Sequence, residues 1–316
     1  MAFEVPKVSY SGKIREIPLG REGNTVIVGG ESCYPFHLFE GEMPNPPRIA
    51  MEVYDSEPED WPDTAIEPFA DVIKDPVAWA RKCVDTYGAE MIALQLAGTD
   101  PNDKDISADE AAKITKEVSD AVDIPMIVLG CGNVEKDTDV LKTVCEACED
   151  RNLIIGPVAE GNYRAIGATA IGYKHTVVAS TPIDINLAKQ LNILLGNLNV
   201  PDEKIIIDPS TGALGYGLEY CYSVMERIRM AALIQEDERL QFPIISNLAR
   251  EVWKTKEVKV PESEAPLLGN IKKRGILIEA LTAQCVLLAG ANILVMRHPE
   301  AISLVKESIK DLMTGN

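Results

Sequence analysis

The chain has 316 residues and a formal net charge of −18, from 31 Lys and Arg against 49 Asp and Glu. This acidity argues against nucleic-acid binding, which depends on clustered cationic side chains, and against adhesion to anionic membranes. Hydrophobic residues make up 46% and charged residues 25%, which is typical of a globular chain of one large domain or two ordinary ones and argues against long disordered regions.

The first 47 residues differ from the rest of the chain. A glycine-bearing turn at 19–24 is followed by β-branched residues, so residues 1–30 are predicted to form a β-hairpin. Residues 31–47 add a segment with proline and aromatic residues. We therefore separate a lead-in of 1–47 from a main part of 48–316, within a single domain, because no linker divides the chain.

From residue 48 onward, short apolar runs alternate with helical segments. Each run is mostly continuous in apolar residues, as expected for parallel strands covered on both faces. The predicted strands are 49–54, 91–96, 126–129, 153–155, 176–179, 205–207, 244–245 and 293–296. The predicted helices are 76–87, 107–122, 137–149, 162–173, 185–195, 218–235, 271–288 and 299–313.

Eight strands alternating with eight helices predict the α/β class and a (β/α)8 TIM barrel. The N-terminal β-hairpin could close the bottom of this barrel. A doubly wound open sheet is the alternative. The first turn between strand and helix has no G-x-G-x-x-G, and we favour the barrel.

In such a barrel, functional side chains follow the carboxyl ends of the strands. The sixth loop is the most distinctive, because Asp208 is followed by Ser210, Thr211 and Gly212, and three glycines lie within six positions. Glycine lets backbone N–H groups approach a ligand closely. Alternatively, Asp208 only caps the turn and the glycines only tighten it. The other candidate binding residues at strand ends are Asp184, Asn186, Asn247 and Arg297.

Cysteine and histidine give no pattern that indicates catalysis or metal binding. Cys131 lies between two glycines, and Cys145 and Cys148 share one face of a predicted helix, so all three are interpreted as packing residues. His298 is interpreted as the cap of the last helix. We expect no catalytic residue and no metal ligand, since H-E-x-x-H, paired C-x-x-C, G-x-S-x-G and P-loop motifs are absent.

The odd number of cysteines, seven, fits a reduced chain, and no apolar run typical of a signal peptide opens the sequence. We therefore expect a cytoplasmic protein with no membrane or nucleic-acid partner. The acidic segment 52–63, which contains Pro58 and Pro62, is predicted to be a solvated loop.

Distinctive stretches, several of them long and unusual, occur at 26–30, 35–41, 51–53, 128–137, 184–186, 189–193, 207–228 and 296–301. They resemble the small subunit of the corrinoid iron–sulfur protein, also called the delta subunit of the acetyl-CoA decarbonylase/synthase complex. The resemblance runs from about residue 14 to the end of the chain.

The resemblance implies a TIM-barrel subunit of a methyl carrier. In this family a large subunit forms a heterodimer with the small one and carries the iron–sulfur cluster and the corrinoid domain, and the corrinoid lies between that domain and the top of the small barrel. A methyl group comes from methyltetrahydrofolate, through a separate methyltransferase, and passes to acetyl-CoA synthase/CO dehydrogenase in the reductive acetyl-CoA pathway of anaerobes. This chain lacks the D-x-H-x-x-G signature of a cobalt ligand, so the large subunit is expected to hold the metal, and the barrel top is expected to form a modest, polar interface.

Two other functions stay open. The barrel also resembles pterin-dependent methyltransferases, because Asp208-Pro209 and Ser246-Asn247 stand where those proteins bind the pterin ring. The third predicted strand ends in Gly130-Cys131-Gly132 instead of a carboxylate, and the fourth ends in Gly156-Pro157 instead of an amide, which favours loss of catalysis. An aldolase or decarboxylase ranks last, since no strand ends in Lys.

Overall fold

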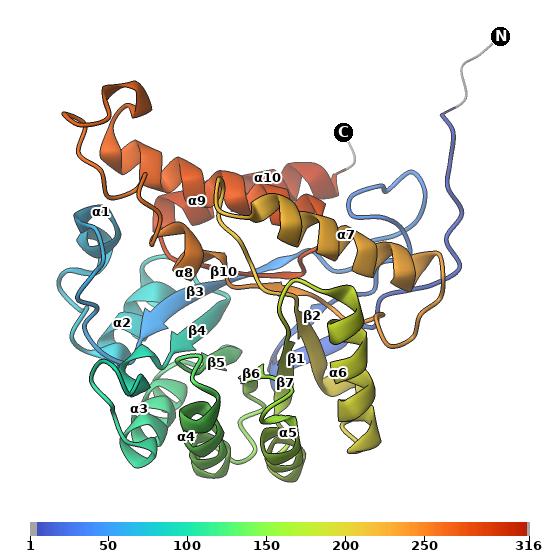
Figure 1. The fold of residues 1–316 in the computed structure, drawn as a ribbon, viewed down its shortest axis with the longest axis horizontal. Helices are drawn as coiled ribbons and strands as arrows, with labels where there is room; N and C mark the ends of the chain where they lie inside the picture. Colours follow the sequence, from blue (N-terminus) through green and yellow to red (C-terminus); the bar gives the residue numbers. More distant parts are fainter. Residues whose placement is uncertain (1–4, 315–316) are drawn as a thin grey trace.

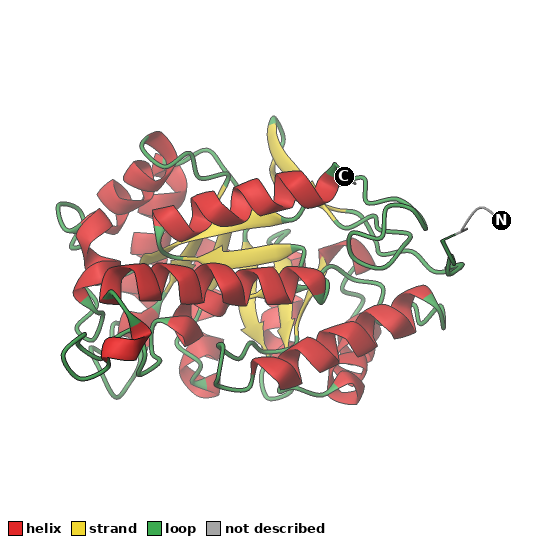
Figure 2. Cartoon of the chain, turned by 90° about the horizontal axis from the view of Figure 1, so that it is seen from above, coloured by secondary structure: helices red, strands yellow, loops and turns green. Residues whose placement is uncertain are grey.

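The computed structural model describes residues 5–314, and its eight parallel strands form a nearly closed barrel with helices on the outside (Figure 1, Figure 2). The hydrogen-bonded order is β8-β7-β6-β5-β4-β3-β10-β9, and a single parallel bridge between Ile207 and Ile244 joins the two ends. The strands are β3 (Arg48–Tyr54), β4 (Met91–Gln95), β5 (Met126–Leu129), β6 (Ile154–Val158), β7 (Thr176–Ser180), β8 (Ile205–Asp208), β9 (Ile245–Ser246) and β10 (Ile293–Met296). The predicted TIM barrel is confirmed.

The main helices are α2 (Pro76–Asp85), α3 (Ala108–Ala121), α4 (Val134–Ala147), α5 (Tyr163–Gly172), α6 (Ile185–Asn197), α7 (Leu218–Leu233), α9 (Ile271–Leu288) and α10 (Pro299–Met313). Local capping explains where several begin. Asp75 accepts hydrogen bonds from the backbone at the start of α2, Ser107 does so for α3, and His298 caps α10 as predicted. The short helices α1 (Asp63–Ile66) and α8 (Leu248–Val252) were not predicted.

The predicted hairpin is formed by β1 (Ile17–Arg21) and β2 (Asn24–Val28), and it closes the amino end of the barrel. Ile17, Leu19 and Val28 are buried together with the inward-facing residues of the barrel strands. The Gly20 carbonyl accepts a 2.6 Å hydrogen bond from Asn152, just before β6, and Arg21 donates to the Val122 carbonyl, before β5. The apolar face of the hairpin therefore completes the lower barrel interior.

The acidic segment 52–63 is not the solvated loop that we expected. Glu52 is 1% exposed, and Asp55 and Trp61 are also buried. Glu52 lies inside β3, where side chains alternate between the two faces, so it points into the barrel between the outward-facing Met51 and Val53. The exposed residues of the segment are Glu57, Glu59, Asp60 and Asp63.

The cysteines are unbonded, and Cys131, Cys145 and Cys148 are buried, as predicted for packing residues. Within residues 5–314, no helix is long and apolar enough to cross a membrane.

Candidate functional site

The carboxyl ends of the strands form a polar floor inside the barrel mouth. The alternation of side chains along a strand creates this floor. Ala93, Ile206 and Ile245 belong to the apolar interior, and the residues two positions further along the chain are the polar Gln95, Asp208 and Asn247. The same spacing places further polar side chains at the inward-facing ends of three other strands, namely Glu52, Ser180 and Arg297. The barrel is therefore apolar at its closed end and polar at its open end.

A small cavity of about 110 Å³ lies above this floor. Its polar lining residues are Gln95, Asp208, Asn247 and Arg250, and the others are Leu129, Gly130, Gly132, Pro157, Val178 and Ile245. Pockets that enclose a drug-sized ligand typically have about 300–1,000 Å³. The cavity therefore has room for a small group or a few water molecules, at about 30 Å³ of liquid volume each.

Asp208 caps its own turn and also lies at the mouth cavity. Its carboxylate accepts a 2.9 Å hydrogen bond from the Ser180 hydroxyl and a 3.0 Å hydrogen bond from the Ser210 backbone N–H, so it does cap its own turn. It also lines the mouth cavity. Burial raises the pKa of Asp208 from 3.8 to about 6, although both hydrogen bonds oppose this shift.

The rest of the sixth loop is held by contacts within the protein. The Ser210 hydroxyl donates to the Thr181 carbonyl over 2.8 Å, and the Thr211 and Ser246 hydroxyls lie 2.9 Å apart. Gly212 is buried, and a Cβ there would lie 2.6 Å from the backbone of Gly217. Gly212 is therefore required by the tightness of the turn, which matches the simpler of the two interpretations.

Asn247 carries a buried polar atom without a partner at the mouth cavity. Its Nδ2 donates weakly to Gln95 across the mouth, over 3.4 Å, whereas its buried Oδ1 has no hydrogen-bond partner among the described residues. A buried acceptor without a partner costs free energy, so this atom favours a donor from a bound molecule or from water. Of the eight predicted binding residues, Asp208 and Asn247 are the two that share the mouth cavity.

The predicted residues Asp184 and Asn186 lie at the start of α6, outside that cavity. The Asp184 carboxylate accepts hydrogen bonds of 2.6 and 3.0 Å from the backbone of Asn186 and Leu187, so it caps α6. The Asn186 side chain is exposed.

Arg297 follows its strand as predicted, but it is only 2% exposed. Its Nε donates to Glu52 over 2.6 Å, and its guanidinium lies 3.4 Å from the centre of the Trp61 ring. The segment after β3 thus covers Arg297, and its charge is neutralised inside the barrel by Glu52.

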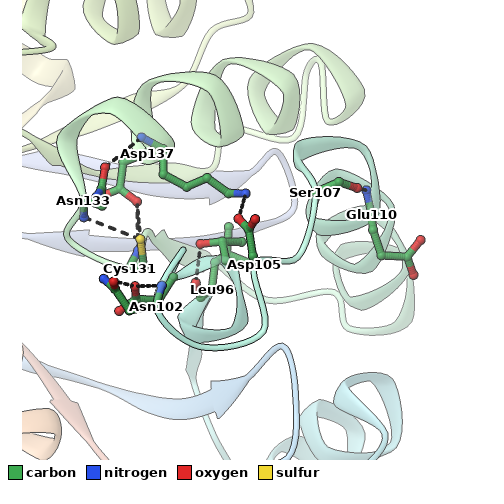
Figure 3. Close-up of polar contacts among 11 residues, drawn as sticks. Leu96, Asn102, Asp105, Ser107, Glu110, Cys131, Asn133 and Asp137 are labelled. Carbon is green, nitrogen blue, oxygen red and sulfur yellow. Dashed lines mark hydrogen bonds and ion pairs between the residues drawn. The ribbon is translucent and has the colours of Figure 1, made fainter.

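The loop after β5 is held by a carboxylate of α4 that sequence reasoning missed (Figure 3). Asp137, in the first turns of α4, accepts 2.9 Å hydrogen bonds from the backbone N–H groups of Cys131 and Gly132, and the Cys131 thiol lies 3.3 Å from it. Arg250 donates to the Cys131 carbonyl over 3.1 Å. Burial raises the pKa of both Asp137 and Cys131. The spacing of Asp137 six residues after Cys131 was the available signal, and its role is to fix this loop.

Exposed apolar side chains follow three of the barrel strands, β5, β7 and β8, on the loops and helix starts after their carboxyl ends. We call this set the rim collar, and it consists of Val134, Ile183, Leu187, Leu214 and Tyr216. A second cavity, of about 190 Å³, lies beside Leu187 between the loops after β6 and β7. The mouth therefore presents exposed apolar side chains beside the polar residues of its floor.

Within residues 5–314, no group of three or more His, Cys, Asp and Glu side chains is placed to hold a metal ion. The barrel resembles solved dihydropteroate synthases. The enzyme of Xanthomonas albilineans, in complex with indole-2-carboxylic acid and 6-chloroguanine, aligns with a TM-score of 0.60 and 11% identity over 95% of this chain and 98% of that one. The enzyme of Thermus thermophilus aligns with a TM-score of 0.56 and 14% identity over 94% and 99%. At such identities the similarity concerns the fold alone.

Sequence comparison is more specific. The acetyl-CoA decarbonylase/synthase complex subunit delta 1 of Methanosarcina thermophila is 37% identical, over 98% of this chain and 73% of that protein. The delta subunit from Archaeoglobus fulgidus is 38% identical, over 98% and 71%. Residues 16–311 match the family described as CO dehydrogenase/acetyl-CoA synthase delta subunit. The chain therefore belongs to this family of delta subunits.

Proposed function

We propose that this chain is the small subunit of a corrinoid iron–sulfur methyl carrier, and that its barrel mouth caps a corrinoid held by the large subunit. The methyl group would come from methyltetrahydrofolate through a methyltransferase and go to acetyl-CoA synthase/CO dehydrogenase. The observation that carries the proposal is the mouth itself, which combines a polar floor with the exposed apolar side chains of the rim collar. A corrinoid is a flat macrocycle fringed with amide groups, so it offers both an apolar surface and polar arms.

The size of the mouth decides how such a ring would lie. A cavity of about 110 Å³ is far smaller than a macrocycle, so the ring would rest across the rim and only a small group would reach the floor. Leu214 and Tyr216, 42% and 50% exposed, would cover part of the ring. Asn247 Oδ1 would accept a hydrogen bond from an amide arm.

Two glycines add open backbone to the same rim. Gly132 lines the mouth cavity, and Gly215 lies in the sixth loop. Both have positive φ, and a Cβ at either position would have no atom within 4 Å. Neither position carries a side chain that would separate the backbone from a ligand, although the Gly132 N–H is already bonded to Asp137. Bound corrinoid supplies the methyl-accepting metal, and the residues of this chain orient the ring and exclude water.

Protection of the corrinoid tests the cap. The large subunit, loaded with reduced corrinoid, is exposed to iodomethane with and without this chain, and alkylation is followed by absorbance. The wild-type chain should slow alkylation of the corrinoid. The variant L214E/Y216E puts charge into an apolar contact, so it should bind the corrinoid face at least tenfold more weakly and protect the corrinoid less from alkylation. The control I27E carries the same kind of change on the hairpin at the opposite end of the barrel, where Ile27 is 40% exposed. Equal protection by L214E/Y216E and wild type would contradict the proposal.

A pterin-dependent methyltransferase is the second candidate, because Asp208, Asn247 and Gln95 do share one cavity. That cavity lies below the usual volume of an enclosing ligand pocket, which favours the cap. Incubating the chain alone with methyltetrahydrofolate and cobalt(I) cobalamin separates the two. Turnover that D208A abolishes would establish the enzyme.

A further inference from the structure

A groove of about 450 Å³ lies at the amino end of the barrel, opposite the mouth. The last turns of α10 form one of its walls, and the segment that leads into β3 forms another; Figure 1 shows both on the same side of the barrel. This volume falls within the 300–1,000 Å³ that is typical of ligand pockets, unlike that of the mouth cavity. We call it the amino-end groove, and the lining residues that carry the argument are Arg48, Ile49, Lys306, Ile309, Lys310 and Met313.

Helix α10 contributes one face to the groove. Lys306, Ile309, Lys310 and Met313 are spaced i, i+3, i+4 and i+7, so they form a stripe along one side of the helix. The two lysines are one turn apart, which places their ammonium groups near each other on the same edge. The stripe therefore combines two cationic side chains with two apolar ones.

The floor of the amino-end groove is apolar. Ile309 is 7% exposed and faces Ile49, which is 4% exposed and comes from the opposite wall. Pro47 is buried beside them, and Met313 is partly buried at the end of the stripe. Apolar surface that lies at the bottom of a groove gains free energy when an apolar ligand covers it.

The cations at the edge of the groove are held in place by the protein. Arg48 donates to the Glu90 carboxylate over 3.1 Å, so this pair is neutral. The Lys306 ammonium donates to the Gly88 carbonyl over 3.0 Å and has two further N–H groups to offer a ligand. Lys310 is exposed. An anion at this edge would therefore meet one fixed and one mobile ammonium group.

The charge of the amino-end groove is opposite to that of the whole chain. Three cations and one carboxylate line it, which leaves an excess of two positive charges, whereas the chain carries −18. Glu307 and Asp311, the carboxylates of α10 next in sequence to the two lysines, fall outside the stripe and do not line the groove. The groove therefore favours an anion, although most of the surface repels one.

We propose that the amino-end groove binds a medium-chain fatty acid. Lys306 and Lys310 would hold the carboxylate, and Ile49, Ile309 and Met313 would cover the alkyl chain. The apolar floor requires a ligand that is mostly apolar, and the two ammonium groups require one small anionic end. A phosphate-rich ligand would leave the floor uncovered.

The length of the stripe sets the length of the ligand. Lys306 and Met313 are seven residues apart, which is about 10 Å along α10 and matches an extended chain of about eight carbons. The inference concerns the end of the barrel opposite the mouth, so it goes beyond the proposed function and does not depend on it.

The test uses octanoate as the probe and the full chain as the protein. Calorimetry gives the stoichiometry and the dissociation constant, and methyl NMR locates the ligand. We expect one saturable site, with shifts at the methyl groups of Ile49, Ile309 and Met313. Each buried CH₂ strengthens binding about fourfold, so hexanoate, which is two CH₂ groups shorter, should bind at least fivefold more weakly. Octan-1-ol, which lacks the charge, should bind at least tenfold more weakly than octanoate.

Variants assign the site. K306M/K310M keeps the apolar floor and removes both ammonium groups, so it should bind octanoate at least tenfold more weakly. M313E puts a carboxylate at the apolar end of the stripe and should weaken binding by a similar factor. The matched control K113M/K116M removes two exposed lysines from α3, which is the same change of net charge, and should stay within twofold of wild type. L214E/Y216E, which alters the rim collar, should also stay within twofold.

Circular dichroism confirms that each variant is folded. The inference is overturned if octanoate shows no saturable binding to wild type or if octan-1-ol binds as tightly as octanoate. It is also overturned if K306M/K310M and M313E bind like wild type, if K113M/K116M loses as much affinity as K306M/K310M, or if the octanoate shifts lie at the rim collar. Failure of the cap in the alkylation assay leaves these outcomes unchanged, so the two proposals are tested separately.

Discussion

The buried ion pair between Arg297 and Glu52 allows a quantitative test of how the barrel mouth is stabilised. The two side chains come from adjacent strands, β10 and β3, and the Nε–Oε2 distance is 2.6 Å at exposures of 2% and 1%. The guanidinium also lies against Trp61. Replacing Arg297 with Met keeps most of the volume and leaves the Glu52 carboxylate buried without its partner.

The expected cost follows from this burial. Breaking a buried ion pair by removing one partner typically costs about 3–5 kcal/mol, because the remaining charge is uncompensated. That is a large part of the roughly 5–15 kcal/mol that stabilises a typical protein. Replacing both charges with apolar residues, in R297M/E52L, removes the unpaired carboxylate and should recover most of the loss.

Urea unfolding followed by tryptophan fluorescence measures these free energies of unfolding. The control K254M breaks the exposed pair of Lys254 with Glu251, which lie 3.2 Å apart, and should cost no more than about 1 kcal/mol. The reasoning fails if R297M costs less than about 1 kcal/mol, or if R297M/E52L is less stable than R297M alone.

Two further predictions concern stability. The pKa of Asp208 in the folded protein, about 6, lies above its ordinary value of 3.8, so ionisation of Asp208 disfavours the folded state. Wild type should therefore lose stability relative to D208N as the pH rises from 4 to 7. A stability difference that does not change with pH in urea titrations would refute this prediction. A Cβ at Gly275 would lie 2.7 Å from the buried Trp253 ring, whereas at Gly172 it would meet no atom within 4 Å. G275A should therefore cost about 1–3 kcal/mol, and G172A should be neutral or stabilising by up to ~1 kcal/mol, in the same unfolding assay.

Strands and long helices were predictable because their signals are local. β5, β10, α9 and α10 have the bounds expected from sequence, since each is a distinct apolar run or begins at a clear cap. α1 and α8 span about one turn each, which is too short to establish a helical period. The error at Glu52 has a different origin, because its partner Arg297 is 245 residues away and no local pattern reports that pairing.

The sequence predicted those residues of the candidate site whose position follows directly from the ends of the barrel strands. Asp208 and Asn247 share a cavity because both follow strands of one barrel. Gln95 was missed as a site residue since its role depends on a contact across the mouth with Asn247, and Arg250 was missed because it lies on the unpredicted α8. Arg297 has the strand position that sequence implied, but the cover provided by Trp61 depends on tertiary packing.

The N-terminal hairpin makes the barrel blind-ended. With Ile17 and Leu19 filling the space beneath the strands, a molecule that reaches Asp208 and Asn247 has to arrive and leave by the same opening. Two molecules that use this opening therefore cannot bind at the same time, and one has to dissociate before the other can bind. The order of events at the rim is therefore set by how quickly each occupant departs.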